Sequence, residues 1–436
     1  MLENGSSRVC RCVGAVASLL AVAVLLASCG EKTTELDPGG DNLKFDKFCS
    51  IDGLSTALRH TDIIVDTTAV VAAPPEELRV KNPELFKLVV GLADPAGAVE
   101  AGATAPRERI TLFAASPKTG VLTPVFTGCV PGASPSELAD REAHGSGGAV
   151  RQYFGSDLKA TISKDQDEFR RLVLLALAKL AKQAEPTGGI GTAAGGSPLV
   201  RLLRPLGPPP SDDPSVRRLF VFSNLDASIP EGLSDAGTAR SEGFKDAEAA
   251  GLHLGLADVY LVPAGGPPSE LSAQFLSAFI LGSQGKLGRA GGFSASGLEP
   301  APTQVINYRG TLSATQSIAA PMTLRLAATK DGQLVNSWIS YTASFGQRST
   351  PVSGQFTCTG DSQCELRSDP EGGLGQLWRI KPGPEPEVRE DAPFGGLRFM
   401  EATETAQGLK GRISDPVISI GRPGGGMTFD AKRTKN

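Results

Sequence analysis

Side chains that commonly carry catalysis are few in this chain, and none of them falls into a known catalytic pattern. The three histidines are far apart: His60, His144 and His253. His144 is close to Ser146, but neighbours in one Gly-rich loop seldom form a catalytic dyad. The GFSASG segment from Gly292 has the wrong spacing for a G-x-S-x-G nucleophile elbow. Gly282–Leu287 lacks the first glycine of a phosphate loop and the Ser or Thr after its lysine. We therefore expect a protein that is not an enzyme.

One cysteine near the start of the chain has a chemical role suggested by its neighbours. Arg8 and Arg11 precede an almost continuous apolar run from Val13 to Leu26, which is shorter than the roughly 20 residues of a membrane span and fits a signal peptide over residues 1–28. The run ends in Leu-Ala-Ser-Cys29, which resembles the bacterial lipobox. In that motif the cysteine thiol accepts diacylglycerol and becomes the first residue of the mature protein. The alternative is a short transmembrane anchor with a chance cysteine.

The resemblance to a lipobox has consequences for location. Two or more fatty chains such as palmitate on Cys29 would anchor the protein stably, because each buried methylene contributes about 0.8 kcal/mol. Gly30 follows Cys29, where an Asp would favour retention in an inner membrane. We expect a lipoprotein of the cell envelope, in the outer membrane if the host has one.

Four other cysteines remain after export: Cys49, Cys129, Cys358 and Cys364. An even number in an exported chain indicates two disulfides, with three possible pairings. Cys358 and Cys364 flank a turn-rich segment between strand-like runs, so a local pair is expected there, which leaves Cys49 to pair with Cys129. The alternative is buried free thiols. No C-x-x-C motif supports a metal site.

The chain has 436 residues, which is too long for one ordinary hydrophobic core. This length predicts two domains. The polar segment after Cys29 indicates a lipidated tether over residues 29–58. A Gly-rich segment from Gly288 to Thr303 separates two regions of different pattern, so we place the boundary near Glu299, with domains at 59–298 and 299–436. The net charge of −4 and the scattered lysines and arginines indicate no nucleic-acid partner.

The first domain alternates strand-like and helix-like segments. Continuous apolar runs predict strands covered on both faces by helices: Ile63–Val65, Arg109–Ala114, Val121–Phe126, Arg218–Phe222 and Ala257–Pro263. Amphipathic segments between them predict helices: one from Pro74 through Leu92, one at Gln166–Ala184 and one within SELSAQFLSAFILGSQ. The alternation predicts an α/β doubly wound, mostly parallel sheet.

The order of these segments resembles the von Willebrand factor type A domain over about Asp62 to Gly292. In that family the first strand ends in Asp-x-Ser-x-Ser, a later loop supplies a threonine, and an Asp follows the fourth strand. These residues hold a divalent cation at a metal-ion-dependent adhesion site, where a partner carboxylate completes the shell. The corresponding residues here are Asp66, Thr68, either Thr192 or Ser197, Asn224 and Asp226.

This sequence departs from the family pattern at two positions. Val70 cannot bind a metal, and Asn224 stands where Asp is usual. A hard cation such as Mg²⁺ or Mn²⁺ needs oxygen ligands, so the resemblance implies at most a weak, degenerate site. The alternative is that Asp66 and Thr68 cap the turn that follows them.

The second domain is composed of short segments that alternate polar and apolar residues, joined by Gly-containing turns such as Lys330–Gln333 and Thr405–Gly408. This pattern predicts a C-terminal antiparallel β-barrel or sandwich. Five aromatic residues could line a ligand cavity or form a core: Trp338, Tyr341, Phe356, Trp378 and Phe399.

Together these observations favour a membrane-anchored envelope lipoprotein that binds or scaffolds a protein partner through its type A-like domain. A lipoprotein that captures a small molecule in the C-terminal barrel is the second possibility, and an envelope hydrolase is the third.

Overall fold

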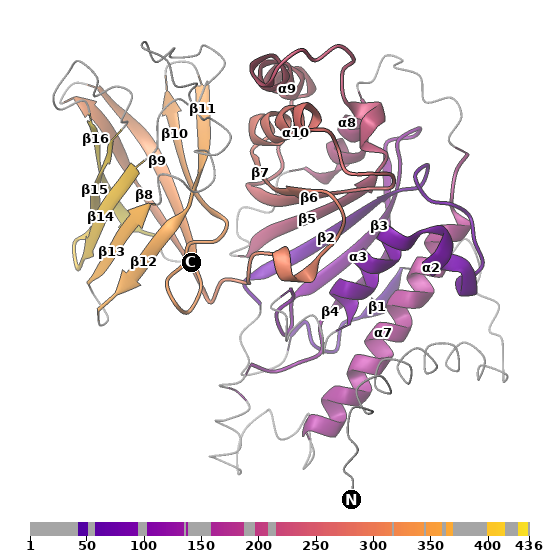
Figure 1. Ribbon diagram of the computed structural model, residues 1–436. Coiled ribbons are helices and arrows are strands. Elements are labelled where there is room, and N and C mark those ends of the chain that lie inside the picture. Colours follow the sequence, from indigo (N-terminus) through magenta and orange to yellow (C-terminus); the bar gives the residue numbers. More distant parts are fainter. Residues whose placement is uncertain are drawn as a thin grey trace, which may run out of the picture.

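A computed structural model describes residues 42–50, 57–94, 103–134, 137, 158–186, 197–207, 215–315, 318–343, 346–359, 363–368, 399–414 and 426–434. The described chain forms two β-sheets, one accompanied by helices and one without them (Figure 1). We call them the α/β domain and the β domain.

Seven strands make up the sheet of the α/β domain. They are β1 (Leu43–Phe45), β2 (Arg59–Asp66), β3 (Arg109–Ser116), β4 (Val121–Cys129), β5 (Val216–Ser223), β6 (Ala257–Pro263) and β7 (Gly285–Ala290). Their order is β1-β4-β3-β2-β5-β6-β7, and β2, β3, β5, β6 and β7 are parallel to one another. β4 is antiparallel to β3 and β1 is parallel to β4. Without β1, the strands follow the 3-2-1-4-5-6 order of doubly wound folds, which confirms the predicted fold class.

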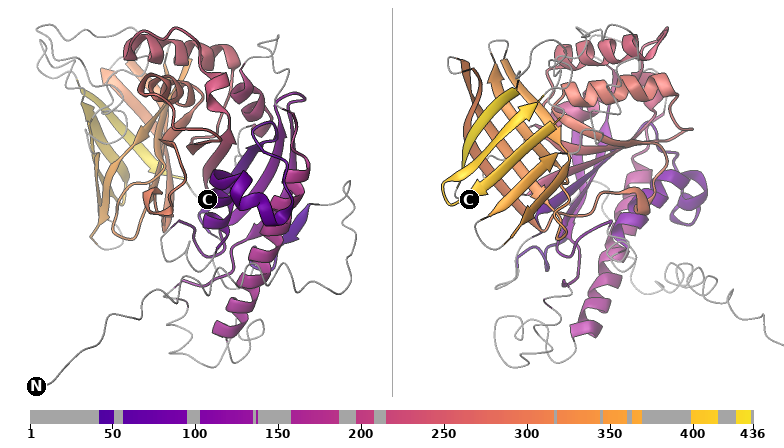
Figure 2. Two further views of the ribbon diagram at one scale, coloured as in Figure 1. Left: turned by 45° about the vertical axis from the view of Figure 1, so that its right-hand side comes forward. Right: turned by 60° about the vertical axis from the view of Figure 1, so that its left-hand side comes forward.

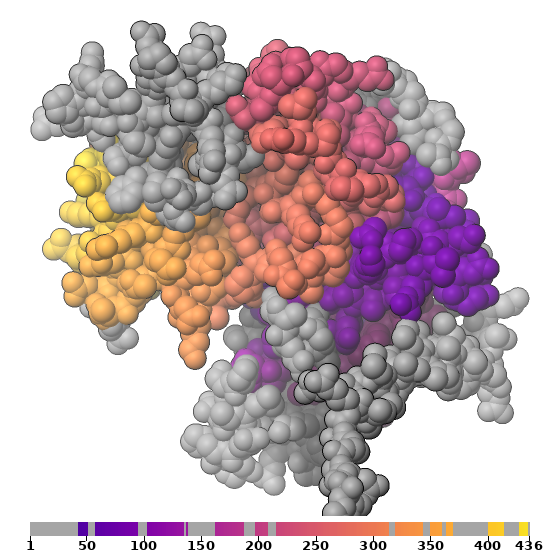
Figure 3. All heavy atoms as spheres, in the orientation of Figure 1, coloured from indigo at the N-terminus to yellow at the C-terminus, as the bar shows by residue number. Residues whose placement is uncertain are grey.

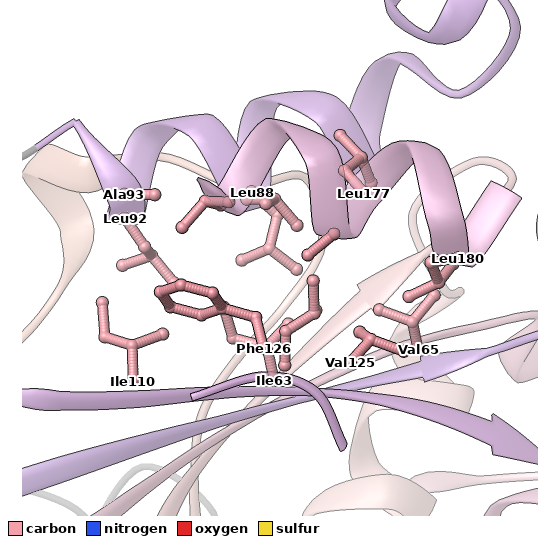
Figure 4. Packing of buried hydrophobic residues seen from close by; sticks show 14 of the residues in the cluster. Ile63, Val65, Leu88, Leu92, Ala93, Ile110, Val125, Phe126, Leu177 and Leu180 are labelled. Carbon is pink, nitrogen blue, oxygen red and sulfur yellow. The ribbon is translucent and has the colours of Figure 1, made fainter. Parts of the chain in front are cut away.

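Helices cover both faces of this sheet (Figures 1 and 2). One face carries α2 (Leu78–Lys81), α3 (Pro83–Ala93) and α7 (Leu158–Lys182); the other carries α8 (Pro198–Leu203), α9 (Ala236–Ala250) and α10 (Glu270–Gly282). Short 3-10 turns lie at Pro75–Glu77, Arg204–Leu206, Leu225–Ser228 and Ala295–Gly297. Figure 4 shows Leu88 and Leu92 of α3 and Leu177 and Leu180 of α7 packed onto the sheet, against Ile63, Val65 and Phe126. Alternate residues of β2 thus enter different cores, which is why this strand is apolar on both faces.

The helix predicted from Pro74 to Leu92 is interrupted at Asn82. Asn82 has φ −130° and ψ 60°, and Pro83 then begins α3. Proline disfavours the helical conformation in the residue before it, so a single helix cannot run through this point. The side-chain amide of Asn82 compensates by bonding both the N–H and the carbonyl of Val71 at 2.8 Å.

The β domain is an antiparallel sheet without helices in its described part. Its strands are β8 (Gln304–Thr315), β9 (Ile318–Ala328), β10 (Ser337–Ala343), β11 (Gly346–Val352), β12 (Gly354–Cys358), β13 (Cys364–Ser368), β14 (Phe399–Thr405), β15 (Gly408–Ser414) and β16 (Gly426–Arg433). They follow the order β11-β10-β9-β8-β16-β15-β14-β13-β12.

This sheet curls until it is nearly closed. The Phe356 N–H on β12 donates to the carbonyl of Gly332 at 2.7 Å, and the Leu334 N–H donates to the carbonyl of Gly354 at 2.8 Å. Gly332 has a φ of +80°, and a Cβ there would lie 2.6 Å from the Phe356 carbonyl oxygen, so the approach requires glycine. Apolar side chains, including Tyr308, Ile339 and Phe429, fill the described interior. The predicted barrel or sandwich is therefore confirmed.

Part of the expected tether is folded. Leu43–Phe45 pairs in parallel with β4, and Phe48 is fully buried in the core of the α/β domain. Three residues are too few to show a strand period in the sequence, which explains the missed strand. The signal peptide and Cys29 lie outside the described residues. Within the described part, no helix is long and apolar enough to cross a membrane.

The β domain packs against the α/β domain (Figures 1 and 3), and the contacts are at the amino ends of the parallel strands. Val216, at the start of β5, packs with Ala327 and Val335. The Asn336 amide donates to the Arg217 carbonyl at 3.1 Å, and Arg325 Nη2 donates to the Leu256 carbonyl at 3.0 Å. The carboxyl ends of the parallel strands, at the opposite edge of the sheet, are therefore left free of these contacts.

Candidate functional site at the carboxyl ends of the parallel strands

The strand order reverses between β2 and β5, and their carboxyl ends carry Asp66 and Ser223. The two strands are direct neighbours, with Val65 opposite Phe222. Open α/β sheets bind ligands in the crevice at such a switch point. The side chains at this edge are therefore the candidate site.

Asp66 is the hub of a small hydrogen-bonded group. Its side chain is buried, with an exposed fraction of 1%. Oδ1 accepts from the Thr68 N–H at 2.9 Å and from the Thr68 hydroxyl at 2.6 Å. Oδ2 accepts from the Ser223 hydroxyl at 2.7 Å. Both carboxyl oxygens thus have hydrogen-bond partners within the fold, as burial of a polar group requires.

Thr67 connects this edge to the end of α7. Its hydroxyl donates to Glu185 Oε1 at 2.9 Å, and the Glu185 N–H donates to the Thr67 carbonyl at 2.9 Å. Lys118, in the turn after β3, lies 3.7 Å from Glu185 Oε2. The loops that follow β2 and β3 and the segment after α7 therefore meet at one place.

The other residues of the predicted metal set are not drawn into this group. Asn224 and Asp226 are exposed in the turn after β5. The Ser197 hydroxyl caps α8 by accepting from the Val200 N–H at 3.4 Å. Thr192 lies outside the described residues. Among described residues, no three His, Cys, Asp or Glu side chains are grouped closely enough to hold a metal ion.

Val70 shows why the family pattern is broken here. It occupies the position of the second hydroxyl in the resemblance, but its side chain is 5% exposed and belongs to the core under α3 and α7. A residue that packs in a core cannot be a ligand to an ion at the sheet edge. Asp66 and Thr68 hydrogen-bond to each other in the turn after β2. The Mg²⁺ or Mn²⁺ site, whose proposed ligands include Thr192, stays a prediction.

Ser223 and Glu185 belong to this group, and we did not predict either from the sequence. Ser223 is the last residue of a continuous apolar run, which is a detectable signal once the run is known to end beside Asp66. Glu185 gives no such signal, because its partner Thr67 is 118 residues away in the chain.

The opposite edge of the sheet contains buried charges that we did not predict either. Glu108 is fully buried and pairs with Arg59 and Arg218, each at 2.8 Å, and it accepts from the Thr61 hydroxyl. Burial opposes ionisation of Glu108, but the charges of Arg218 and Arg59 overcome this effect and lower its pKa to about 2. Burial, together with repulsion from Arg59, lowers the pKa of Arg218 to about 10. This triad joins the amino ends of β2, β3 and β5 and is a structural element.

The aromatic residues of the β domain have mixed positions. Phe356 belongs to the interior cluster and Tyr341 is half-buried against it, while Trp338 is buried. Trp378 lies outside the described residues, and the side chain of Phe399 does too. Phe356 and Tyr341 are therefore part of the core of the β domain, while Trp338 is buried outside that cluster.

Two disulfides are formed, and their pairing is the one expected. Cys49 bonds Cys129 across 80 residues, fastening the segment after β1 to the end of β4. Cys358 bonds Cys364 across 6 residues, joining β12 to β13. The first bond lies within the α/β domain and the second within the β domain.

Comparison with known proteins adds little to this geometry. No family model matches the chain, and no curated protein matches it. Among solved structures it is similar to a protein described as von Willebrand factor type A from Catenulispora acidiphila, with 10% sequence identity and a TM-score of 0.26. The likeness covers 73% of this chain and 64% of that one, so less than two thirds of the other chain is spanned. The fold class rests on the strand order and helix placement described above.

Proposed function

We propose that this protein is a lipid-anchored envelope protein that binds or scaffolds a protein partner through the carboxyl-end edge of its α/β domain. The observation that carries the proposal is the placement of the β domain. It is bonded to the amino ends of the parallel strands, so the described contacts between the domains leave the edge at Asp66 and Ser223 available.

Exposed apolar side chains support a protein partner at this edge. The large apolar side chains that are exposed in the described residues are Val71, Val80 and Val121, at 51%, 77% and 54%. Val71 follows the end of β2, Val80 lies on the short helix after it, and Val121 follows the turn after β3. Exposed apolar side chains in these segments are available for contact with a partner.

The charge at this edge indicates what kind of surface the partner presents. The connection from Asn224 to Ala236 carries the exposed acids Asp226, Glu231 and Asp235 and contains no lysine or arginine. A partner with apolar side chains beside a basic patch would complement it, since complementary charge speeds association and excludes wrong partners. The proposed role is binding rather than catalysis, without a nucleic acid and without a bound metal.

Membrane attachment through Cys29 remains part of the proposal. Twelve residues separate Cys29 from Asn42, and an extended chain of that length reaches at most about 40 Å. A partner would then be met close to the membrane surface of the envelope.

Photo-crosslinking in cells tests the partner site. A photoreactive residue is placed at position 71, and a second protein carries it at position 331, where Asp331 is exposed on the turn after β9. We expect a discrete crosslinked protein from position 71 and none from position 331. Asp226→Arg should reduce the crosslink at least tenfold, while Asp331→Arg should leave it unchanged. Equal crosslinking from both positions, or none from position 71, would count against the proposal.

A further inference from the structure

A second cluster of charged side chains lies between the two domains, on the side opposite the proposed partner site. Asp258 is the second residue of β6 and is 6% exposed. Lys286 on β7 is its register partner, and Glu299 lies in the connection to β8. The β domain contributes Arg325 from β9 and Asn336 from the β9–β10 connection. The cluster therefore includes groups from both sides of the interface.

The cations of this cluster are already engaged. Lys286 Nζ pairs with Glu299 Oε1 at 2.7 Å. Arg325 Nη2 donates to the Leu256 carbonyl at 3.0 Å and to the side-chain oxygen of Asn336. Asp258 forms no salt bridge within the described part of the chain, and the Asn336 side chain hydrogen-bonds to it.

Several buried polar atoms here have no hydrogen-bond partner among the described residues. They are Asp258 Oδ1, Glu299 Oε2 and Arg325 Nε. Two of the three are carboxylate oxygens on neighbouring acids, and a proton on one of them would turn an acceptor into a donor. Two carboxylates with one lysine between them thus form a site that gains from holding one extra proton.

The charges that face Asp258 come from every element around it. β5 contributes Arg218, β6 itself contributes Tyr260, β7 contributes Lys286, the connection to β8 contributes Glu299, and β9 contributes Arg325. Burial and the Glu299 charge raise the pKa of Asp258 to about 6, although Lys286 and Arg325 act in the opposite direction. Burial opposes the charge of Lys286, but Asp258 and Glu299 raise its pKa, so the ammonium stays charged throughout the relevant range.

We infer that the interface between the α/β domain and the β domain is a proton-sensitive latch, in which a protonated Asp258 favours docking and an ionised Asp258 loosens it. Exposed to water, the carboxyl would have its ordinary pKa near 3.9. The docked form therefore binds the proton more tightly than the undocked form. Docking is strongest below about pH 4, weakens as the pH rises from about 4 to 6, and is constant above that.

The latch is independent of the proposed partner site, since it uses the amino ends of the strands. The Asp258 carboxyl has a pKa near 6 when the domains are docked and near 3.9 when they are apart. The equilibrium constant for docking therefore falls about twentyfold between about pH 4.5 and pH 7.

Thiol labelling of the full chain measures this opening. Val335 is 2% exposed and lies in the apolar contact between the domains, so Val335→Cys places a thiol that reacts only when the interface opens. Ile339→Cys, in the interior of the β domain, is the matched control. Labelling rates at each pH are divided by the rate of the same chain in denaturant, which removes the pH dependence of the thiol itself.

We expect the relative labelling rate at position 335 to rise about twentyfold from pH 4.5 to pH 7, and the rate at position 339 to stay constant. Asp258→Asn should abolish the rise, while Asp430→Asn, at an exposed acid of β16, should not. If Asp258→Asn does not fold, Glu299→Gln should move the midpoint of the rise to lower pH. A flat profile at position 335, a parallel rise at 339, or an unchanged midpoint in Glu299→Gln would overturn the inference.

Discussion

The role of Asp66 can be separated from that of a metal ligand by comparing two substitutions. Asp66→Ala removes the side chain that accepts three hydrogen bonds, and the buried Ser223 hydroxyl loses its acceptor. Hydrogen bonds to charged groups contribute about 1.5–3 kcal/mol each, but they are not additive within one group. Breaking a buried charged network typically costs about 3–5 kcal/mol, so we expect a loss of this size in the free energy of unfolding.

Asp66→Asn should be much milder. The amide oxygen can still accept from the Thr68 N–H and hydroxyl, and the amide NH₂ can donate to Ser223 after its hydroxyl has turned. We expect a loss of about 1–2 kcal/mol, comparable to that of Ser223→Ala. A metal ligand would behave differently, because the amide has no charge to offset the dehydration of the ion.

Urea unfolding with and without Mg²⁺ or Mn²⁺ measures both effects. An ion present at about 100 times its Kd stabilises the folded state by about 2.7 kcal/mol. We expect no measurable stabilisation of the wild type, because both oxygens of Asp66 are occupied within the fold. A metal-dependent gain of more than about 1 kcal/mol that disappears in Asp66→Asn would refute the capping role. The sharper challenge is Val70→Ser combined with Asn224→Asp, which restores the family pattern. If the edge at Asp66 is a degenerate cation site, this variant binds the ion more tightly than Asp66→Ala does.

Three further outcomes are expected. Loss of the Cys49–Cys129 disulfide, which closes a loop of 80 residues, should destabilise the protein by about 4–5 kcal/mol. Loss of the Cys358–Cys364 disulfide, which closes a loop of 6 residues, should cost about 2 kcal/mol. Unfolding of the two double Cys→Ala variants measures both losses. Cys29→Ser should leave an unprocessed precursor without acyl mass, and lipid labelling equal to the wild type would contradict the anchor. The lowered pKa of Glu108 contributes stability that is present above about pH 4.5 and is lost as the pH falls towards 2. Glu108→Gln should therefore reduce the free energy of unfolding by about 3 kcal/mol at pH 7 and by progressively less in acid. A loss that does not depend on pH would contradict this.

The parts of the fold that the sequence predicted are those that local pattern determines. The apolar run at Ile63–Val65 is buried on both faces because helices cover both sides of β2. The local Cys358–Cys364 pair followed from its position in a turn, and the second pair followed from the first. The alternating strands of the β domain required only that one face be buried and the other be exposed.

The parts that the sequence did not predict depend on partners far away in the chain. Arg218 is an unremarkable basic residue at the start of a strand until Glu108, 110 residues earlier, is placed beside it. Ser223 and Asp66 are 157 residues apart and meet only because the strand order reverses between them. The hydrophobic periodicity of a sequence contains no information about pairs that are so far apart. The metal ligands implied by the family resemblance therefore cannot be confirmed from the sequence alone.

The two edges of the α/β sheet appear in the structure with different chemistry, and the difference has a physical reason. Charges buried at the amino ends are matched with fixed partners such as Arg59 and Glu108, and the interface with the β domain adds Arg325 and Asn336. Such networks contribute little net stability compared with apolar packing, but a misplaced partner leaves a charge buried alone, which is costly. They therefore favour one orientation of the β domain. The carboxyl edge has the group around Asp66 and the contacts of Thr67 with Glu185, all within the α/β domain. Val71, Val121 and Asp226 are exposed at this edge. The β domain is held at the opposite end of the sheet, so it does not cover the carboxyl edge. The exposed side chains of that edge are therefore suited to contact a partner.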